Sequence, residues 1–281
     1  MNSENTILVL GGTGKTGRRV VERLKARGVA VRVASRSGTP PFDWENRATW
    51  VPALRNVGSA YVTYQPDLAV PGADDAIRSF TELAVASGVR HLVLVSGRGE
   101  EEAQRCEQIV QQAGVDWTIL RASWFSQNFS ESYLLEPVLS GEVVLPAGDV
   151  PEPFIDADDI ADVAVAALTE EGHVGQLYEL TGPRMLTFAQ AVAEIARASK
   201  RAIRYVQVSP EEYVAALEEQ GVPAEYVWLL NYLFATVLDG RNACLTDGVQ
   251  RALGRMPRDF TDYARETAAS GVWSGERYIS S

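Results

Sequence analysis

The sequence feature that most restricts the fold of this chain is a glycine-rich turn near its start. A short apolar run at residues 7–10 leads directly into Gly11-Gly12-Thr13-Gly14-Lys15-Thr16-Gly17, and apolar residues at helical spacing follow until Gly28. Such a run is typical of a buried parallel strand, and a glycine is a common helix stop. The order of strand, glycine turn and helix predicts the first unit of a dinucleotide-binding α/β domain.

The function of such a turn explains why it needs glycines. Without side chains, the chain turns tightly, its backbone N–H groups approach a pyrophosphate, and the helix packs close to the strand. The N-terminus of the helix adds positive potential for the anion. We therefore expect phosphate contacts from six residues of the turn: Gly11, Thr13, Gly14, Lys15, Thr16 and Gly17.

Two other interpretations of the turn are weaker. A tight strand-to-helix turn without any ligand does not account for the second strand, which follows at the spacing of a nucleotide-binding domain. A P-loop would need a glycine five positions before Gly14, where the chain has Val9, and the loop is too short to wrap phosphates in that manner.

The end of the second predicted strand indicates which dinucleotide is bound. Residues 29–34 are predicted as this strand, and Ser35-Arg36-Ser37 follow it. In NAD-specific domains an acidic residue near this point binds the ribose 2′-hydroxyl. Arg36 and Ser37 suit a 2′-phosphate instead, because they offer charge-assisted hydrogen bonds. We expect NADP(H) as the cofactor, the alternative being that Arg36 is a solvated surface residue.

Strand and helix patterns alternate through the first half of the chain. Strands are predicted at residues 42–44, 60–64, 91–95 and 117–120, and helices at residues 73–86 and 100–113. This alternation predicts an α/β fold with a doubly wound parallel sheet, a Rossmann domain with right-handed crossovers.

The second half of the chain is less regular. Strands are predicted at residues 143–145 and 177–180, and helices at residues 160–168, 188–198, 211–220, 224–238, 248–253 and 260–268. We expect residues 1–150 to form the Rossmann domain. Residues 151–281 are expected to return to the sheet and to form a small, mostly helical lobe that covers the substrate.

Composition excludes several partners. The chain has 26 basic and 37 acidic side chains, and the net charge of −11 argues against nucleic acid or an anionic membrane as a partner. No apolar run approaches the roughly 18 residues of a membrane span, so we expect a cytoplasmic protein. Its histidines, His91 and His173, and its cysteines, Cys106 and Cys244, lack ligand spacing, so no metal site is expected.

Further segments, together with the glycine turn, carry a family resemblance. They are Val93-Leu94-Val95-Ser96, Trp117-Thr118-Ile119-Leu120-Arg121, Trp124-Phe125-Ser126-Gln127-Asn128-Phe129, Phe154-Ile155-Asp156 and Asp159-Ile160-Ala161. Over roughly residues 6–240, the chain resembles the NmrA-like branch of the atypical short-chain dehydrogenases. It is similar to the NADPH quinone and triphenylmethane reductases, and above all to the ergot-alkaloid festuclavine and agroclavine dehydrogenases, which reduce a cyclic iminium.

The resemblance implies an extended Rossmann fold with the substrate held between two lobes. By position, the nicotinamide would be flanked by two segments, Ser96-Gly97 and residues 122–124, which begin with Ala122. Tyr64, Gln65 and Pro66 would follow the adenine-side strand.

One expected catalytic pair is missing. Most short-chain dehydrogenases use a tyrosine and a lysine four residues later to move a proton. This chain has three lysines, Lys15, Lys25 and Lys200, and the residues four positions before them are Gly11, Val21 and Ala196. An alcohol dehydrogenase, an epimerase or a dehydratase is therefore disfavoured. Hydride transfer to an already electrophilic iminium, quinone or cationic dye is compatible with the absence. Ser96 is our candidate catalytic residue, as a hydrogen-bond donor.

Several residues are candidates for the substrate site. Trp124 and Phe125, with Phe154, would wall a flat or cationic substrate, or they pack as core. Asn128 would bind substrate or cap a turn, and Arg98 would steer an anionic group or lie solvated in its loop. The acidic residues 100–102 and Asp156, Asp158 and Asp159 are expected to stabilise helix N-termini.

Three functions remain open on these residues. The first is an NADPH-dependent reductase of small molecules. The second is a regulatory protein that senses NADP(H) without turnover, and the third is a cyclase or isomerase that keeps the nucleotide as a structural element. The stripe Tyr226, Leu229, Leu230 and Leu233 is core or a homodimer contact.

Overall fold

The computed structural model of the chain describes residues 6–274. These residues form two compact units that interleave along the sequence. The first unit contains residues 6–122, 157–180 and 247–255, and the second contains residues 123–156, 181–246 and 256–274.

Within residues 6–274, six parallel strands form the sheet of the first unit, in the order β2-β1-β3-β4-β5-β7. The strands are β1 (Thr6–Leu10), β2 (Val31–Ala34), β3 (Val57–Val62), β4 (His91–Gly97), β5 (Asp116–Ala122) and β7 (Gln176–Leu180). The chain runs outward from β1 to β2 and then crosses to β3 on the other side of β1. Open α/β sheets bind ligands at the carboxyl ends of the strands where the order reverses in this way.

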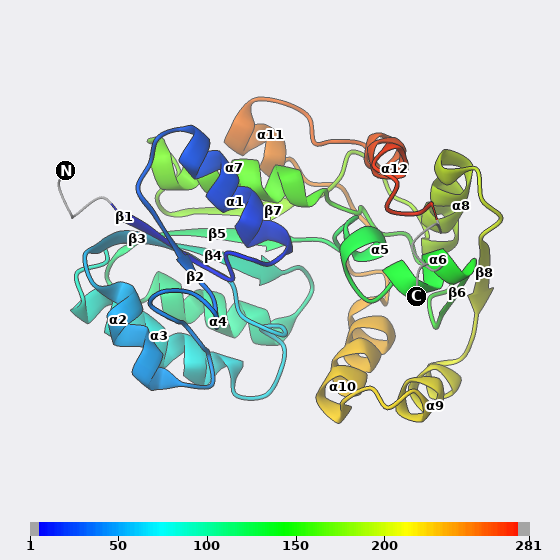
Figure 1. Cartoon of the computed structure of the whole chain (residues 1–281), viewed down its shortest axis with the longest axis horizontal. Helices are drawn as coiled ribbons and strands as arrows, with labels where there is room; N and C mark the ends of the chain where they lie inside the picture. Colours follow the sequence, from blue (N-terminus) through cyan, green and yellow to red (C-terminus); the bar gives the residue numbers. More distant parts are fainter. Residues whose placement is uncertain (1–5, 275–281) are drawn as a thin grey trace. The chain divides into compact units, whose positions relative to one another are not determined.

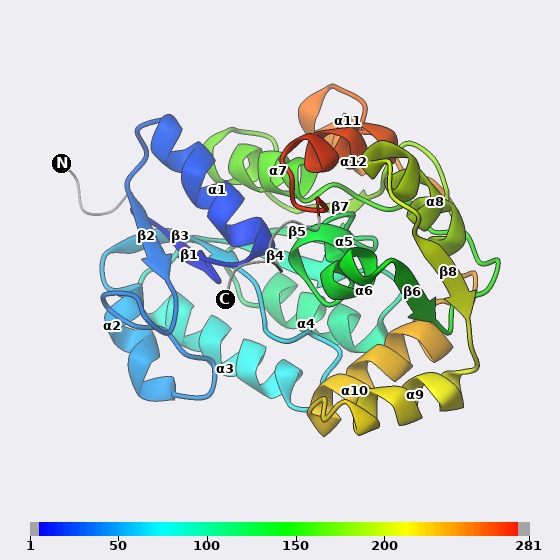
Figure 2. The same cartoon turned by 45° about the vertical axis from the view of Figure 1, so that its right-hand side comes forward.

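Helices cover both faces of this sheet (Figures 1 and 2). One face carries α1 (Lys15–Ala26), α7 (Ala157–Thr169) and α11 (Gly248–Leu253), and the other carries α2 (Trp50–Leu54), α3 (Ala73–Ala86) and α4 (Glu101–Gln111). A short 3₁₀ helix at Arg47–Thr49 precedes α2. Helix α1 buries the stripe Val20, Val21 and Leu24 and leaves Glu22 and Lys25 exposed, as amphipathic spacing requires.

The second unit is mostly helical around an aromatic core. Its elements are α5 (Asn128–Glu131), α6 (Leu135–Ser140), β6 (Glu142–Leu145), α8 (Phe188–Ser199), β8 (Arg204–Gln207), α9 (Pro210–Glu219), α10 (Ala224–Tyr232), a π-helix (Leu233–Val237) and α12 (Phe260–Ala269). Strands β6 and β8 pair in parallel. Capping boxes begin α8 at Thr187 and α9 at Ser209, where each side chain accepts an N–H from the third helical residue.

The expected fold class is confirmed, and the helices at residues 73–86 and 248–253 lie where the spacing predicted them. The strand predicted at residues 42–44 is wrong. Asp43 there forms only an isolated bridge to Asn46, and the Trp44 indole donates to the Thr63 carbonyl at 3.0 Å. The Trp44 ring packs among other aromatic rings. Because residues 42–44 add no strand next to β2, β2 is the edge strand of the sheet.

The second unit departs from expectation in two details. The four-residue strand β8 went unpredicted, since both of its ends are exposed and its pattern is short. The chain also leaves the first unit directly after β5 and returns with α7, whereas we placed one boundary near residue 150. None of the helices within residues 6–274 combines the length and apolar character that crossing a bilayer requires.

Candidate functional site

The glycine turn between β1 and α1 is built so that side chains do not fit. Gly11 has a left-handed φ of +61°, and its carbonyl accepts the Gly14 N–H at 2.8 Å. A Cβ on Gly17 would lie 2.2 Å from the Gly11 carbonyl oxygen, and a Cβ on Gly12 would lie 2.7 Å from Cγ1 of Val33. The turn therefore requires glycine by backbone conformation at one position and by close packing at two others.

The start of α1 offers its N–H groups to a ligand. Gly14 occupies the N-cap position, where it has no side chain to accept them, and the first turn of α1 holds no acidic residue. Thr13 and Gly14 are exposed, Lys15 is half-buried and Thr16 is buried. The first N–H groups of a helix have no carbonyl partner within that helix, and together with the helix dipole they make this turn suitable for an anion such as a pyrophosphate.

The segment after β3 lies beside this turn. The Thr63 hydroxyl donates to the Leu10 carbonyl at 3.1 Å, immediately before Gly11. The Tyr64 ring packs on Trp44 with 5.0 Å between centroids, Gln65 is exposed and Pro66 is half-buried. The carboxyl ends of β1 and β3 thus bring two loops together at the point where the strand order reverses.

The turn after β2 presents a cation. Arg36 and Ser37 are exposed, and among residues 6–274 no acidic side chain pairs with Arg36. The Gly12 N–H donates to the Ala34 carbonyl at 3.2 Å, which ties the glycine turn to the end of β2. Arg36 therefore lies in the loop after β2, the strand that pairs with β1 and so neighbours the glycine turn.

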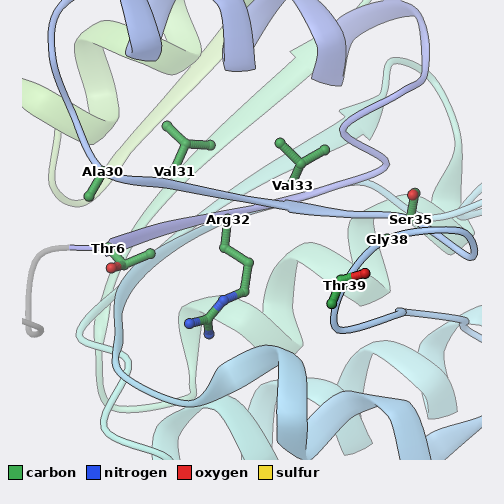
Figure 3. A pocket seen from close by; sticks show the side chains of 8 residues that line it. All are labelled: Thr6, Ala30, Val31, Arg32, Val33, Ser35, Gly38 and Thr39. Atoms are coloured by element: carbon green, nitrogen blue, oxygen red, sulfur yellow. The ribbon is translucent and has the colours of Figure 1, made fainter.

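A shallow pocket follows β2 itself (Figure 3). It is lined by Thr6, Ala30, Val31, Arg32, Val33, Ser35, Gly38 and Thr39. The Arg32 guanidinium already donates to the carbonyls of Ala53 and Arg55. The pocket contains none of the residues of the glycine turn, so it is separate from the candidate pyrophosphate site.

Charged side chains that are buried or half-buried connect β4, β5 and β7. Arg121 on β5 donates to Glu107 on α4 at 2.9 Å and 2.5 Å, and to Glu179 on β7 at 2.9 Å. The hydrogen bonds to Glu107 raise the pKa of Arg121 above its ordinary value. Ser96 on β4 donates its hydroxyl hydrogen to the same Glu107 carboxylate at 2.6 Å.

This network bears on two expected site residues. The hydrogen of the Ser96 hydroxyl is directed to Glu107, so in this arrangement Ser96 offers a ligand only an acceptor. The expectation that Arg98 lies solvated in its loop is wrong, since it is 6% exposed and its Nε lies 3.4 Å from the Glu179 carboxylate. Gly97 and Ala122 are partners in the pairing of β4 with β5, and the Arg98 N–H donates to the Ala122 carbonyl.

Two carboxyl groups at the same edge of the sheet were missed by the sequence analysis. Glu100 follows β4 and Asp67 follows β3, and their side chains are hydrogen-bonded to each other. We expected Glu100 to interact with the N-terminus of α4, but it makes no side-chain capping bond there. Its position three residues after β4, the strand next to the switch point, was the signal that could have identified it.

The expected substrate residues lie in the second unit, apart from Arg98. Trp124 is half-buried, with its ring 5.1 Å from Phe188 and 4.9 Å from Phe234. Phe154 is 3% exposed within the aromatic core, which leaves little of its ring for a ligand. Phe125 is half-buried and bridges to Ile155, and Asn128 is the half-buried first residue of α5.

Comparisons with known proteins agree with this geometry. A family model described as NAD(P)H-binding matches residues 11–171. The chain is 31% identical to the uncharacterised oxidoreductase YesF of Bacillus subtilis, with 96% of this chain and 97% of YesF covered. It is 30% identical to agroclavine dehydrogenase of Claviceps fusiformis, with 95% and 98% covered. This match confirms the resemblance to the clavine dehydrogenases.

A solved structure shares the fold. The triphenylmethane reductase of a Citrobacter species, complexed with NADP(H), superposes with a TM-score of 0.74 at 20% identity. The superposition covers 94% of this chain and 99% of the reductase. The similarity extends over both units of the chain, and not over the sheet alone.

Proposed function

The chain belongs to the NAD(P)H-binding family, and from this premise we propose that it is an NADPH-dependent reductase that transfers hydride to an activated acceptor, such as a cyclic iminium ion or a quinone. The observation that carries the proposal is the glycine turn at the reversal of strand order, where Gly14 makes no side-chain capping bond and the first turn of α1 contains no acidic residue. Named oxidoreductases among the relatives support the same activity.

The residues at this edge fit a dinucleotide. Gly11 and Gly14 with the first turn of α1 would hold the pyrophosphate, helped by Thr13 and Lys15. Thr16 is buried, so its contribution would come through its backbone N–H. Arg36 and Ser37 would hold the 2′-phosphate. The segment of Tyr64, Gln65 and Pro66, together with Ser96, Gly97 and Ala122, would line the rest of the dinucleotide.

The chemistry requires little more from the protein than positioning. When bound, the nicotinamide supplies hydride to an acceptor held above it. A cyclic iminium ion or a cationic dye is already charged and becomes neutral on accepting hydride, so it needs no proton. This fits a chain that lacks the tyrosine and lysine of the ordinary short-chain dehydrogenases. We assign Trp124, Phe125 and Asn128 to the acceptor side, where an aromatic face attracts a cation.

A panel of acceptors tests the proposal. We expect NADPH to be oxidised in the presence of quinones, cyclic iminium ions or cationic dyes, and not in their absence. Tight NADPH binding without turnover on any acceptor would favour a cofactor-sensing protein. Product formed without consumption of NADPH would favour a cyclase or isomerase.

The preference for NADPH rests on Arg36. The variant Arg36→Ala removes the exposed guanidinium, and we expect the Kd for NADPH to rise about 10- to 100-fold while the Kd for NADH changes little. Titration of both cofactors by fluorescence measures the effect. Arg27→Ala is the control, since Arg27 is also an exposed arginine, located just beyond the other end of α1, where it pairs with Glu170. Equal losses for the two cofactors would exclude a 2′-phosphate contact.

A further inference from the structure

The carboxyl pair of Glu100 and Asp67 lies on the edge of the sheet that carries the glycine turn. Asp67 follows β3 and Glu100 follows β4, and these neighbouring strands are hydrogen-bonded to each other. Lys15, the first residue of α1, interacts electrostatically with Asp67. The loops after β1 and β3, at the switch point of the sheet, and the loop after the neighbouring strand β4 therefore bring one lysine and two carboxyl groups together.

The carboxyl group of Glu100 is packed against the backbone, and one of its two oxygens lacks a donor within residues 6–274. Glu100 is 6% exposed, and no N–H or O–H group within residues 6–274 donates to its Oε2. A Cβ at Gly97 would lie 2.0 Å from Oε1 and 2.4 Å from Oε2 of Glu100, so the carboxyl rests directly on the end of β4. An ionised carboxylate in such a place would lose its hydration without compensation, which favours the neutral acid.

The partner of Glu100 explains where the proton resides. A hydrogen bond between two carboxyl groups requires one proton, and burial raises the pKa of both groups. Asp67 accepts the Ala69 N–H at 2.9 Å and faces Lys15, and both contacts favour its ionised form. Glu102 and Glu107 on α4 face Glu100 and raise its pKa further. The proton therefore resides on Glu100.

We infer that Glu100, kept protonated by Asp67, donates the proton that the reduction of a neutral acceptor requires. The inference rests on the proposed function. A quinone that takes hydride gains two electrons and one hydrogen and becomes a hydroquinone monoanion. The O–H bond of Glu100 then breaks, a new O–H bond forms on the acceptor oxygen, and the carboxylate recovers a proton from water. A cationic acceptor takes hydride alone and uses no proton.

Comparing the two kinds of acceptor tests this role. For Glu100→Gln, we expect kcat with a quinone to fall about a hundredfold or more, the usual contribution of a general acid. We expect kcat with a cationic dye to stay within about twofold. Glu101→Gln, the exposed neighbour on the first turn of α4, is the control and should change neither value. An equal loss with both acceptors would overturn the inference.

The cofactor-free protein gives a second, independent readout. Because the pKa of folded Glu100 is raised, the folded protein retains a proton that the unfolded chain releases once the pH exceeds the ordinary value of 4.5. The free energy of unfolding therefore loses a contribution as pH rises above that value. Urea unfolding should show this decrease in the wild type and in Glu101→Gln, and a smaller decrease in Glu100→Gln. Parallel pH profiles for all three proteins would overturn the shared proton.

Failure of the inference and failure of the proposed function give different results. If the wild-type protein fails to oxidise NADPH with any of the acceptors, both the proposed function and the inference are overturned. A wild-type protein that reduces a quinone, with Glu100→Gln doing so equally well, overturns only the role of Glu100.

Discussion

Gly17→Ala should raise the Kd for NADPH about a hundredfold or more. The added Cβ would lie 2.2 Å from the carbonyl oxygen of Gly11 and 2.7 Å from its carbonyl carbon, so the backbone of the turn must move. The Gly14 N–H is hydrogen-bonded to the same carbonyl, and the N–H groups that should meet the pyrophosphate would move with it. A displacement of about 1 Å in a binding constellation is enough for an effect of this size.

Calorimetric titration with NADPH measures the change, and circular dichroism with thermal unfolding checks that the variant folds. Overpacking of this kind should cost about 1–3 kcal/mol of stability, which leaves a folded protein to titrate. Gly148→Ala is the matched control, because its Cβ would meet only the flexible end of Gln207 at 3.2 Å. A Kd for Gly17→Ala within about threefold of the wild-type value would contradict the assignment of this turn to the pyrophosphate.

Arg121→Met should destabilise the protein by about 3–5 kcal/mol. The Arg121 side chain is 17% exposed, and its guanidinium forms two hydrogen bonds with Glu107, whose side chain is 3% exposed. Methionine replaces the apolar stem of the side chain but, among residues 6–274, leaves the buried Glu107 carboxylate with only the Ser96 hydroxyl as a donor. Removing one partner of a buried ion pair is costly because the remaining charge stays desolvated.

Urea unfolding at neutral pH measures this loss. Arg105→Met is the control, since Arg105 pairs with Glu102 on the exposed side of the same helix, α4, at 3.5 Å. That pair should contribute no more than about 1 kcal/mol. If both variants lost the same small amount, the pair of Arg121 and Glu107 would have no special role in holding β4 and β5.

The glycine turn was predictable because its constraints are local. The positive φ at Gly11 and the close packing at Gly17 both require glycine, so the spacing of glycines in the sequence indicates the turn directly. The buried strands of the sheet were predictable for a similar reason, since each is a short apolar run. Arg36 was assigned from its position at the end of the second predicted strand, and it lies exposed in the loop after β2.

The features that escaped prediction depend on partners far along the chain. Arg98 is buried because Glu179 on β7 approaches it, and nothing near Arg98 in the sequence indicates that pairing. The sequence around Glu100, with three acidic residues in a row, is typical of an ordinary helix start. Only the fold brings Asp67 against Glu100, and the Glu100 side chain makes no capping bond to α4. The aromatic run at residues 42–44 resembled a strand, but its rings pack into the core in place of a strand's backbone pairing.

Transfer of a deuterium label tests the central claim most directly. NADPH carrying deuterium at the transferable position of the nicotinamide would be mixed with the wild-type protein and a cyclic iminium ion or a cationic triphenylmethane dye, and the product examined by mass spectrometry. Direct hydride transfer predicts one deuterium on the reduced carbon, retained in ordinary water because a carbon–deuterium bond does not exchange. Tight NADPH binding with no labelled product from either acceptor would contradict the account of this chain as a reductase.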